Sequence, residues 1–251
     1  MNLSRAAFCF VPAFLAALSI SNAFAQDVRS VASPDGSLVF RLFLAQPSEA
    51  RLFRLAYQVV LRGKLVLDTS YLGINVHDQE PVLGENVGLT GSRILHPDAR
   101  HNVLAAEYMQ NGSIGRRINI EAGVWNDGVA FRYVLPRSTP LEDLLIEDEE
   151  TEFSFAQDLS DPPRAAAPLP FFTHQPAGWI GIYESGAQGY PRATLAPSEA
   201  STLITRLKTQ ATIPPVAFEG STPFTGPWRI VIVAPDRADL ARTAIARELL
   251  R

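Results

Sequence analysis

Short runs in which apolar residues occupy every second position recur along this 251-residue chain. In Ser37–Ala45 this spacing holds for Leu38, Phe40, Leu42 and Leu44. It holds again in Val129–Leu135, directly after the turn tripeptide Asn126-Asp127-Gly128. Because successive side chains of a strand point to opposite faces, a period of two predicts strands with one buried face, and Asn-Asp-Gly favours a tight hairpin between two of them. The pattern therefore predicts an antiparallel, all-β fold.

The C-terminal part of the sequence has a different hydrophobic pattern. Pro227–Ala234 contains a continuous apolar run of strand length, which is typical of a strand covered on both faces. Residues 235–251 then place their apolar side chains at helical spacing, with Asp236 as the candidate N-cap. Nothing resembles the regular strand–helix alternation of a parallel α/β domain. We expect one β-sandwich domain over residues 26–251 that ends in a helix.

The first 25 residues have the pattern of a secretory signal peptide. Arg5 precedes the apolar stretch Ala6–Ile20, and the small residues Ala23 and Ala25 stand where a signal peptidase reads, so we expect cleavage before Gln26. A membrane anchor is the alternative, but the stretch is short for a bilayer. We therefore predict a periplasmic or secreted protein with no membrane attachment after cleavage.

Composition excludes several kinds of site. The one cysteine lies inside the predicted signal peptide, so the cleaved chain would have no disulfide, thiolate metal site or catalytic thiol. Its 22 basic and 26 acidic residues give a net charge of −4, without the clustered positive charge of nucleic-acid-binding proteins.

Catalytic and metal-binding motifs are also missing from the sequence. Its four histidines lack the spacing of a zinc site, and neither a nucleophile elbow nor a phosphate-binding loop is present. Five carboxylates fall between Glu147 and Glu152, which we interpret as a solvated strand edge or loop rather than a cation site. We predict no catalytic residue.

A few side chains stand out by their local context. Glu184 ends the apolar run Gly178–Tyr183 and precedes a Gly-rich stretch, so it is either a ligand or acid, or simply a solvated strand end. Aromatic side chains are the usual platforms for sugar rings, although core packing is the alternative for each. We expect Trp125 and Trp228 to lie in the core, and the other aromatic candidates are Trp179, Tyr183 and Tyr190.

Six segments, taken in order, carry a family resemblance. They are "SPDG" from Ser33, "SYLGI" from Ser70, "WNDGVAFRY" from Trp125, "DEETEFSF" from Asp148, "WIGIYESGAQGYPRATL" from Trp179 and "PWRIVIVA" from Pro227. In this order they resemble the N-terminal domain of glycoside hydrolase family 97. The resemblance implies an antiparallel β-super-sandwich of the galactose-mutarotase-like kind. It also implies a relation to exported α-glucosidases and α-galactosidases that bind calcium and carry their catalytic carboxylates on a (β/α)8 barrel.

The resemblance also implies roles for single residues. Glu184 falls on the family glutamate that joins calcium coordination. Trp179, Tyr183 and Tyr190 stay candidate sugar contacts on the ground of their aromatic rings alone. Calcium is then expected only in a complex with a barrel, because the remaining ligands belong to the barrel. The sequence departs from the family where Tyr183 replaces a histidine and where "AQDLSDPPRAAAPLP" replaces an aromatic segment. It ends at Arg251, about where the family passes into the barrel, so we expect the barrel to be absent.

Three functions follow from these observations. The first is a non-catalytic module of an exported α-glycosidase system, which binds an α-glucoside or α-galactoside or docks on a separate catalytic barrel. The second is a fragment of a calcium-dependent exo-α-glycosidase. The third is a stand-alone enzyme similar to an aldose mutarotase, for which His174 and Glu184 would be the acid and base.

Overall fold

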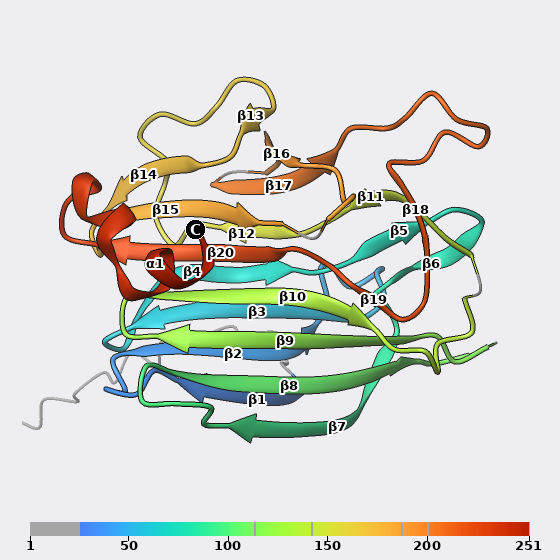
Figure 1. Cartoon of the computed structure of the whole chain (residues 1–251), viewed down its shortest axis with the longest axis horizontal. Helices are drawn as coiled ribbons and strands as arrows, with labels where there is room; N and C mark the ends of the chain where they lie inside the picture. The colour runs from blue at the N-terminus through green and yellow to red at the C-terminus, as the bar shows by residue number, and fades with distance from the viewer. Residues whose placement is uncertain (1–25, 113, 142, 187, 200, 251) are drawn as a thin grey trace, which may run out of the picture.

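The computed structural model describes residues 26–112, 114–141, 143–186, 188–199 and 201–250, so the predicted signal peptide lies outside the described residues. Antiparallel strands make up most of this structure, and two short helical segments follow the last strand (Figure 1). The predicted all-β class with a C-terminal helix is confirmed. None of the described helices is long and apolar enough to cross a membrane.

Two sheets form the larger part of the sandwich. The first has the order β1-β2-β3-β4, with the bounds β1 Gln26–Ala32, β2 Leu38–Ala45, β3 Arg54–Leu61 and β4 Lys64–Tyr71. The second, called the long sheet below, has the path β14-β15-β20-β10-β9-β8-β7, and β19 (Phe224–Thr225) also pairs with β10. Its strands are β14 Phe171–Gln175, β15 Gly178–Ser185, β20 Trp228–Ala234, β10 Gly128–Leu135, β9 Arg117–Trp125, β8 His101–Gln110 and β7 Val87–Leu95.

Two smaller sheets complete the fold. One has the order β18-β11-β5-β6, with the bounds β18 Phe218–Ser221, β11 Asp143–Glu149, β5 Ile74–Val76 and β6 Gln79–Leu83. The other has the order β12-β17-β16-β13, with the bounds β12 Glu152–Ser154, β17 Thr202–Leu207, β16 Ala193–Pro197 and β13 Ala167–Pro168.

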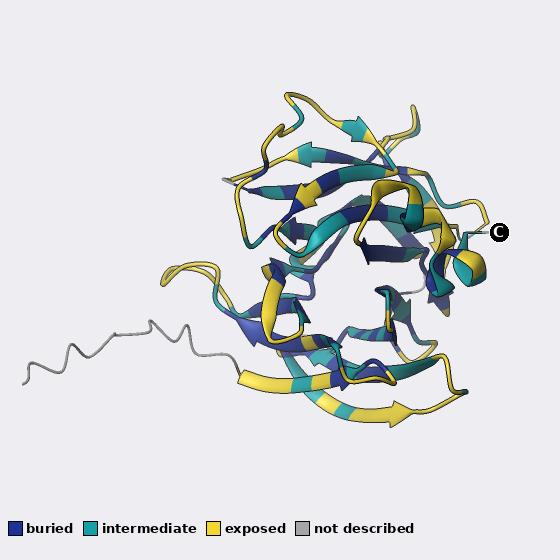
Figure 2. Ribbon diagram, turned by 90° about the vertical axis from the view of Figure 1, so that its left-hand side faces the viewer, coloured by how far each residue is buried: buried dark blue, intermediate teal, exposed yellow. Residues whose placement is uncertain are grey.

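The main core lies between the first sheet and the long sheet, where Figure 2 shows the buried residues on facing surfaces. Phe131 of β10 is its centre, with ring centroids 5.7 Å from Phe40 of β2 and 4.7 Å from Tyr57 of β3. Phe40 and Phe131 lie at inward positions that the period of two predicted. Close aromatic packing adds about 0.5–1.5 kcal/mol per pair to the burial of apolar area, so it helps to fix the two layers against each other.

The Asn126-Asp127-Gly128 turn connects three parts of the molecule. It joins β9 to β10, where Trp125 pairs with Gly128 as in a two-residue hairpin. Glycine is required here, because a Cβ atom on Gly128 would lie 2.7 Å from the carbonyl oxygen of Val231. The Asn126 side chain accepts a hydrogen bond of 3.2 Å from the backbone N–H of Asp35, and the Asp127 carboxylate accepts from Ala244 and Ile245.

The predicted C-terminal helix is divided into two pieces, η1 (Arg237–Arg242) and α1 (Ala244–Leu249). Asp236 occupies the predicted N-cap position, at the start of η1, but its side chain makes no capping hydrogen bond. Thr243 interrupts the helical path with an extended backbone, and its hydroxyl accepts from the N–H of Ala246. Leu240 and Ile245 from the two pieces are buried in a second core cluster on the outer face of the long sheet.

Replacement of Asp127 by alanine removes a carboxylate from the N-terminus of α1. We expect the variant to lose about 1–2 kcal/mol of unfolding free energy, because two backbone N–H groups lose their acceptor. Urea denaturation measures this change. Asp236→Ala is the matched control, since that aspartate also precedes a helical segment but caps nothing. Equal effects of the two substitutions would contradict the assigned role of Asp127.

Candidate functional site

A buried arginine lies at the centre of the site. Arg229 is on β20, within the apolar run that was expected to be covered on both faces, and it has 0% exposure. Its neighbours Trp228 and Ile230 belong to the cluster on the outer face of the long sheet, so the Arg229 side chain points to the inner face. Fully buried arginines are rare unless they are paired, so its partners decide whether this arrangement is stable.

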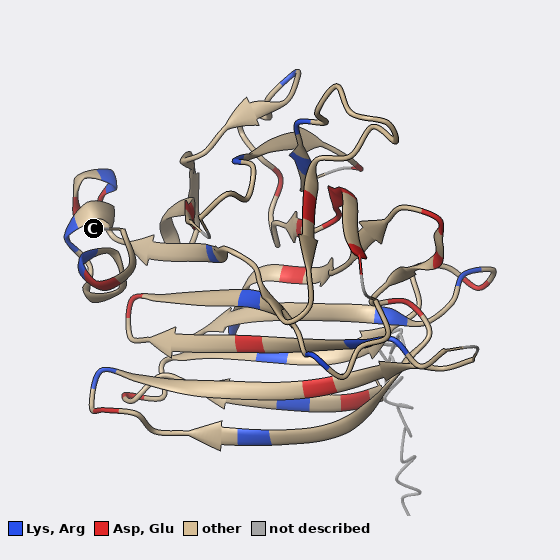
Figure 3. Ribbon diagram, turned by 45° about the vertical axis from the view of Figure 1, so that its right-hand side comes forward, with Lys and Arg blue, Asp and Glu red and all other residues tan. Residues whose placement is uncertain are grey.

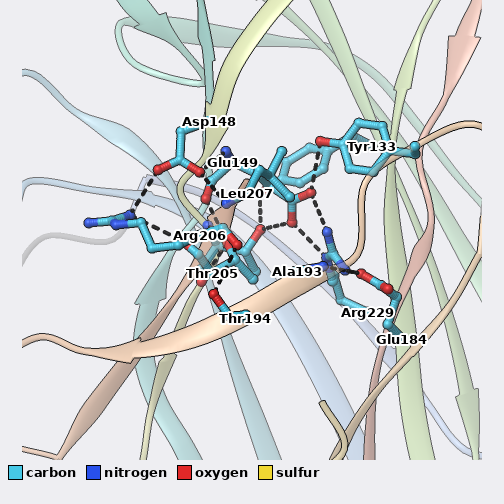
Figure 4. Close-up of polar contacts among 12 residues, drawn as sticks. Tyr133, Asp148, Glu149, Glu184, Ala193, Thr194, Thr205, Arg206, Leu207 and Arg229 are labelled. Atoms are coloured by element: carbon cyan, nitrogen blue, oxygen red, sulfur yellow. Dashed lines mark hydrogen bonds and ion pairs between the residues drawn. The ribbon is translucent and has the colours of Figure 1, made fainter. Parts of the chain in front are cut away.

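Arg229 is held by two carboxylates from different strands (Figure 4). Its Nε and Nη2 atoms donate to the two carboxylate oxygens of Glu149 over 2.7 and 2.6 Å, and its Nη1 atom donates to Glu184. The side chains of Arg229 and Glu149 are each 1% exposed. A bidentate arginine–carboxylate pair is among the strongest polar contacts in proteins, and here it joins β20 of the long sheet to β11 of a smaller sheet.

Glu149 is fully surrounded by hydrogen-bond donors. Besides Arg229, it accepts from the hydroxyl of Thr151 over 2.7 Å and from that of Tyr190 over 3.2 Å. The Tyr133 hydroxyl lies 2.7 Å from the Thr151 hydroxyl and extends the network to β10. The interpretation of the acidic segment as a solvated edge is therefore wrong for Glu149, although its neighbour Glu147 keeps 37% of its side chain exposed.

Burial and charge shift the pKa values of this cluster. Burial alone would lower the pKa of Arg229, but the adjacent Glu149 and Glu184 raise it above its ordinary value. The pKa of Tyr190 is raised well above its usual range, first by burial and then by the charge of Glu149. Arg229 therefore stays charged and Tyr190 stays neutral.

Glu184 connects this buried cluster to the surface. It lies near the end of β15, its side chain is 10% exposed, and its Oε2 atom accepts from both Arg229 and the N–H of Ala193. It lines two neighbouring hollows, of about 240 and 230 Å³, and Arg192 lines both as well. Arg229 therefore fixes one carboxylate oxygen of Glu184, and the Glu184 side chain also lines the two hollows.

The donor set limits what Glu184 could do with a metal ion. Calcium takes 6–8 oxygen ligands, and no group of three or more His, Cys, Asp or Glu side chains in the described part of the chain is arranged to hold a metal. Glu184 could supply one ligand of such a site, and the other oxygen ligands would have to come from another domain or another protein. Its role as a calcium ligand stays a prediction.

The three candidate sugar contacts do not lie together. Trp179 and Tyr183 belong to the cluster on the outer face of the long sheet. Glu184 is the next residue after Tyr183 on β15, so its side chain points to the inner face. Tyr183 lies flat over Gly181, where an added Cβ atom would be 2.5 Å from its ring. Tyr190 lies on the inner side, with ring centroids 5.2 and 5.6 Å from Phe218 and Phe224. Tyr190 lines one of the two hollows beside Glu184 and Tyr183 lines the other, whereas Trp179 lines neither.

Two other sequence expectations concern Trp125 and Trp228. Trp125 is 2% exposed and lies in the core as predicted, stacked against His101 with a centroid distance of 4.4 Å. Trp228 is only partly buried, because it lies on the outer face under the guanidinium of Arg132, which is 4.2 Å from its ring centroid.

The pair considered for a mutarotase is not assembled. His174 pairs directly with Trp179 across β14 and β15, which places it on the outer face. Glu184 is on the inner face, five residues farther along β15, or about 16 Å at the rise of a strand. These two side chains do not share a cleft.

Comparison with known proteins identifies the family. Residues 31–161, more than half of the chain, match the family described as the glycosyl-hydrolase 97 N-terminal domain. The chain belongs to glycoside hydrolase family 97. It is 27% identical over 146 residues to a retaining α-galactosidase of Bacteroides thetaiotaomicron, a match that covers 54% of this chain and 20% of the relative.

Solved structures agree on the fold. A family 97 enzyme from Pseudoalteromonas sp. strain K8, in complex with acarbose, matches 88% of this chain and 38% of its own, with 19% identity and a TM-score of 0.73. A β-arabinopyranosidase matches 84% of this chain and 40% of its own, with 21% identity and a TM-score of 0.64. The chain thus spans about a fifth of the curated relative and about two fifths of these structures.

Removal of the Glu149 charge would leave Arg229 poorly compensated in the core. We expect Glu149→Gln to cost on the order of 3 kcal/mol of unfolding free energy, because a buried guanidinium then loses its bidentate partner. Chemical denaturation followed by circular dichroism measures the loss. Glu219→Gln, at an exposed position of β18, is the control and should change stability by no more than about 0.5 kcal/mol. A loss as small as that of the control would refute the assigned importance of the pair.

Proposed function

We propose that this family 97 domain is a non-catalytic module of an α-glycosidase system and acts by docking against a catalytic (β/α)8 barrel. The proposal holds whether a separate chain or a longer form of this one supplies the barrel. In the described β-sandwich, Arg229 engages Glu184, the acid that lines both of the hollows beside Arg192, together with the buried Glu149. The two carboxylates are thus held by one guanidinium rather than set across a sugar as an acid and base pair. An α-glucoside or α-galactoside would then bind at the junction with the barrel.

One observation carries this proposal. The Glu184 carboxylate, which the family resemblance places at the calcium site, is anchored through one oxygen to a buried arginine and borders two surface hollows. Burial of Arg229 and Glu149 makes that anchor rigid. A fixed carboxylate beside a surface hollow suits a site whose other ligands come from a catalytic barrel. Such a shared site needs each ligand to be held in place by a rigid scaffold.

Calcium, when bound at such a junction, would supply a positive charge that holds sugar hydroxyls and polarises nearby oxygen atoms. This chain would contribute Glu184 to the ion, Arg229 and the Ala193 N–H to orient that carboxylate, and Arg192 to the wall of both hollows. Tyr190 would close the hollow on the side of Glu149.

We also propose that the protein is exported and acts in the periplasm or outside the cell. The support is the sequence pattern of residues 1–25, with its basic start, apolar stretch and small residues before Gln26. Mass spectrometry of the protein from its natural host should find a chain that begins at Gln26. An intact N-terminus would contradict export by this route.

The function is tested with calcium and with a barrel. The purified chain should release no nitrophenol from nitrophenyl α-glucoside or α-galactoside, and calorimetry should find calcium binding no tighter than about 1 mM, since one carboxylate makes a poor site. Addition of the chain to the separately produced barrel of the Pseudoalteromonas enzyme should increase calcium-dependent hydrolysis. Glu184→Gln should reduce that increase at least tenfold.

Glu219→Gln is the control variant and should leave the increase unchanged, because Glu219 is exposed on β18. Hydrolysis by the chain alone, tight calcium binding by the chain alone, or an increase that is insensitive to Glu184 would each contradict the proposal.

A further inference from the structure

A third hollow is lined by neither Glu184 nor Arg192. It has a volume of about 550 Å³, and its walls come from β14, β15, the start of η1 and the Pro/Ala-rich connector before β13. This volume is within the range of small-molecule sites, which is about 300–1,000 Å³. The residues that matter for its chemistry are Asp161, Arg164, Phe172, Trp179 and Arg237.

The hollow has an aromatic wall. Phe172 and Trp179 are partly buried on the outer face of the long sheet, so their rings are fixed by the strands and keep some accessible surface. The guanidinium of Arg237 lies over both rings, with its carbon 4.6 Å from the Phe172 centroid and 5.8 Å from the Trp179 centroid. Stacking on aromatic rings orients a guanidinium while its N–H groups remain able to donate at its edge.

Charge also distinguishes this hollow. Arg164 and Arg237 are exposed, and neither forms an ion pair or a side-chain hydrogen bond with other described residues. With Asp161 as the acidic member of the wall, the hollow has a net charge of +1, although the whole chain has a net charge of −4. The positive charge is therefore a local property of this hollow, since the protein as a whole is negatively charged.

We infer that this hollow is a second saccharide site that binds an acidic sugar, a uronate, by its carboxylate and its ring. Guanidinium groups match a carboxylate with two parallel N–H donors, and Arg164 and Arg237 supply two such groups. An aromatic ring packs against the C–H face of a pyranose, and Trp179 offers such a ring beside them. Asp161 adds an acceptor for sugar hydroxyls. This hollow shares no lining residue with the two hollows at the proposed barrel junction.

Isothermal titration of the full chain with sodium D-glucuronate tests the inference, with D-glucose as the neutral counterpart. We expect glucuronate to bind at least tenfold more tightly than glucose, since a neutral sugar has no carboxylate for the two guanidinium groups. Arg237→Gln and Arg164→Gln should each weaken glucuronate at least tenfold. Trp179→Ala should weaken it by a similar factor, and Trp179→Phe should keep most of the affinity.

Two control variants distinguish this hollow from the barrel junction and from a general effect of surface charge. Arg51→Gln, an exposed arginine on the β2–β3 loop, should leave the affinity unchanged, as should Glu184→Gln. Thermal melting of each variant confirms that it is folded. Absence of glucuronate binding at 10 mM, equal affinity for glucose, or competition by inorganic phosphate without dependence on Trp179 would each overturn the inference, and none of these outcomes bears on the barrel junction.

Discussion

The ion pair between Arg229 and Glu149 is the contact on which the arrangement of this domain depends. Both groups are removed from water, which costs several kcal/mol for each ion, and only good geometry with complete hydrogen bonding offsets that cost. Here the guanidinium donates to two carboxylates, and Glu149 also accepts from Thr151 and Tyr190. The pair therefore fixes how β20, β11 and β15 meet, and it sets the position of Glu184.

The two faces of the long sheet have different chemistry. Figure 3 shows that charged residues are spread thinly along its strands. Arg229 is a fully buried charged residue among the apolar side chains of the core. On the inner face Arg229 and Glu184 lead to the hollow beside Arg192. On the outer face Trp179 and its neighbours pack under η1 and α1 and border the third hollow, beside Arg237. Alternation along β15 thus separates two surfaces whose residues are adjacent in the sequence.

Local patterns predicted the class of the fold but not the buried charges. Alternation and the Asn-Asp-Gly turn have local causes, so the hairpin and the inward side of β2 and β10 followed from the sequence. Arg229 and Glu149 are 80 residues apart, and nothing near either residue indicates its partner. A bulge between Ile146 and Asp148 also shifts the alternation of β11, so that Glu149 rather than Asp148 joins Leu144 and Ile146 in the interior. In contrast, the positions of Trp179 and Glu184 in one strand are an odd number of residues apart. The sequence alone therefore could have predicted that their side chains point to opposite faces.

A double-mutant cycle on Arg229 and Glu149 tests the central claim most directly. Unfolding free energies of the parent, Arg229→Met, Glu149→Leu and the double variant yield the coupling between the two residues. The account predicts that each single variant loses several kcal/mol and that the double variant recovers part of the loss, with a coupling of at least about 2 kcal/mol. Additive losses, with no recovery in the double variant, would show that the pair does not organise the core.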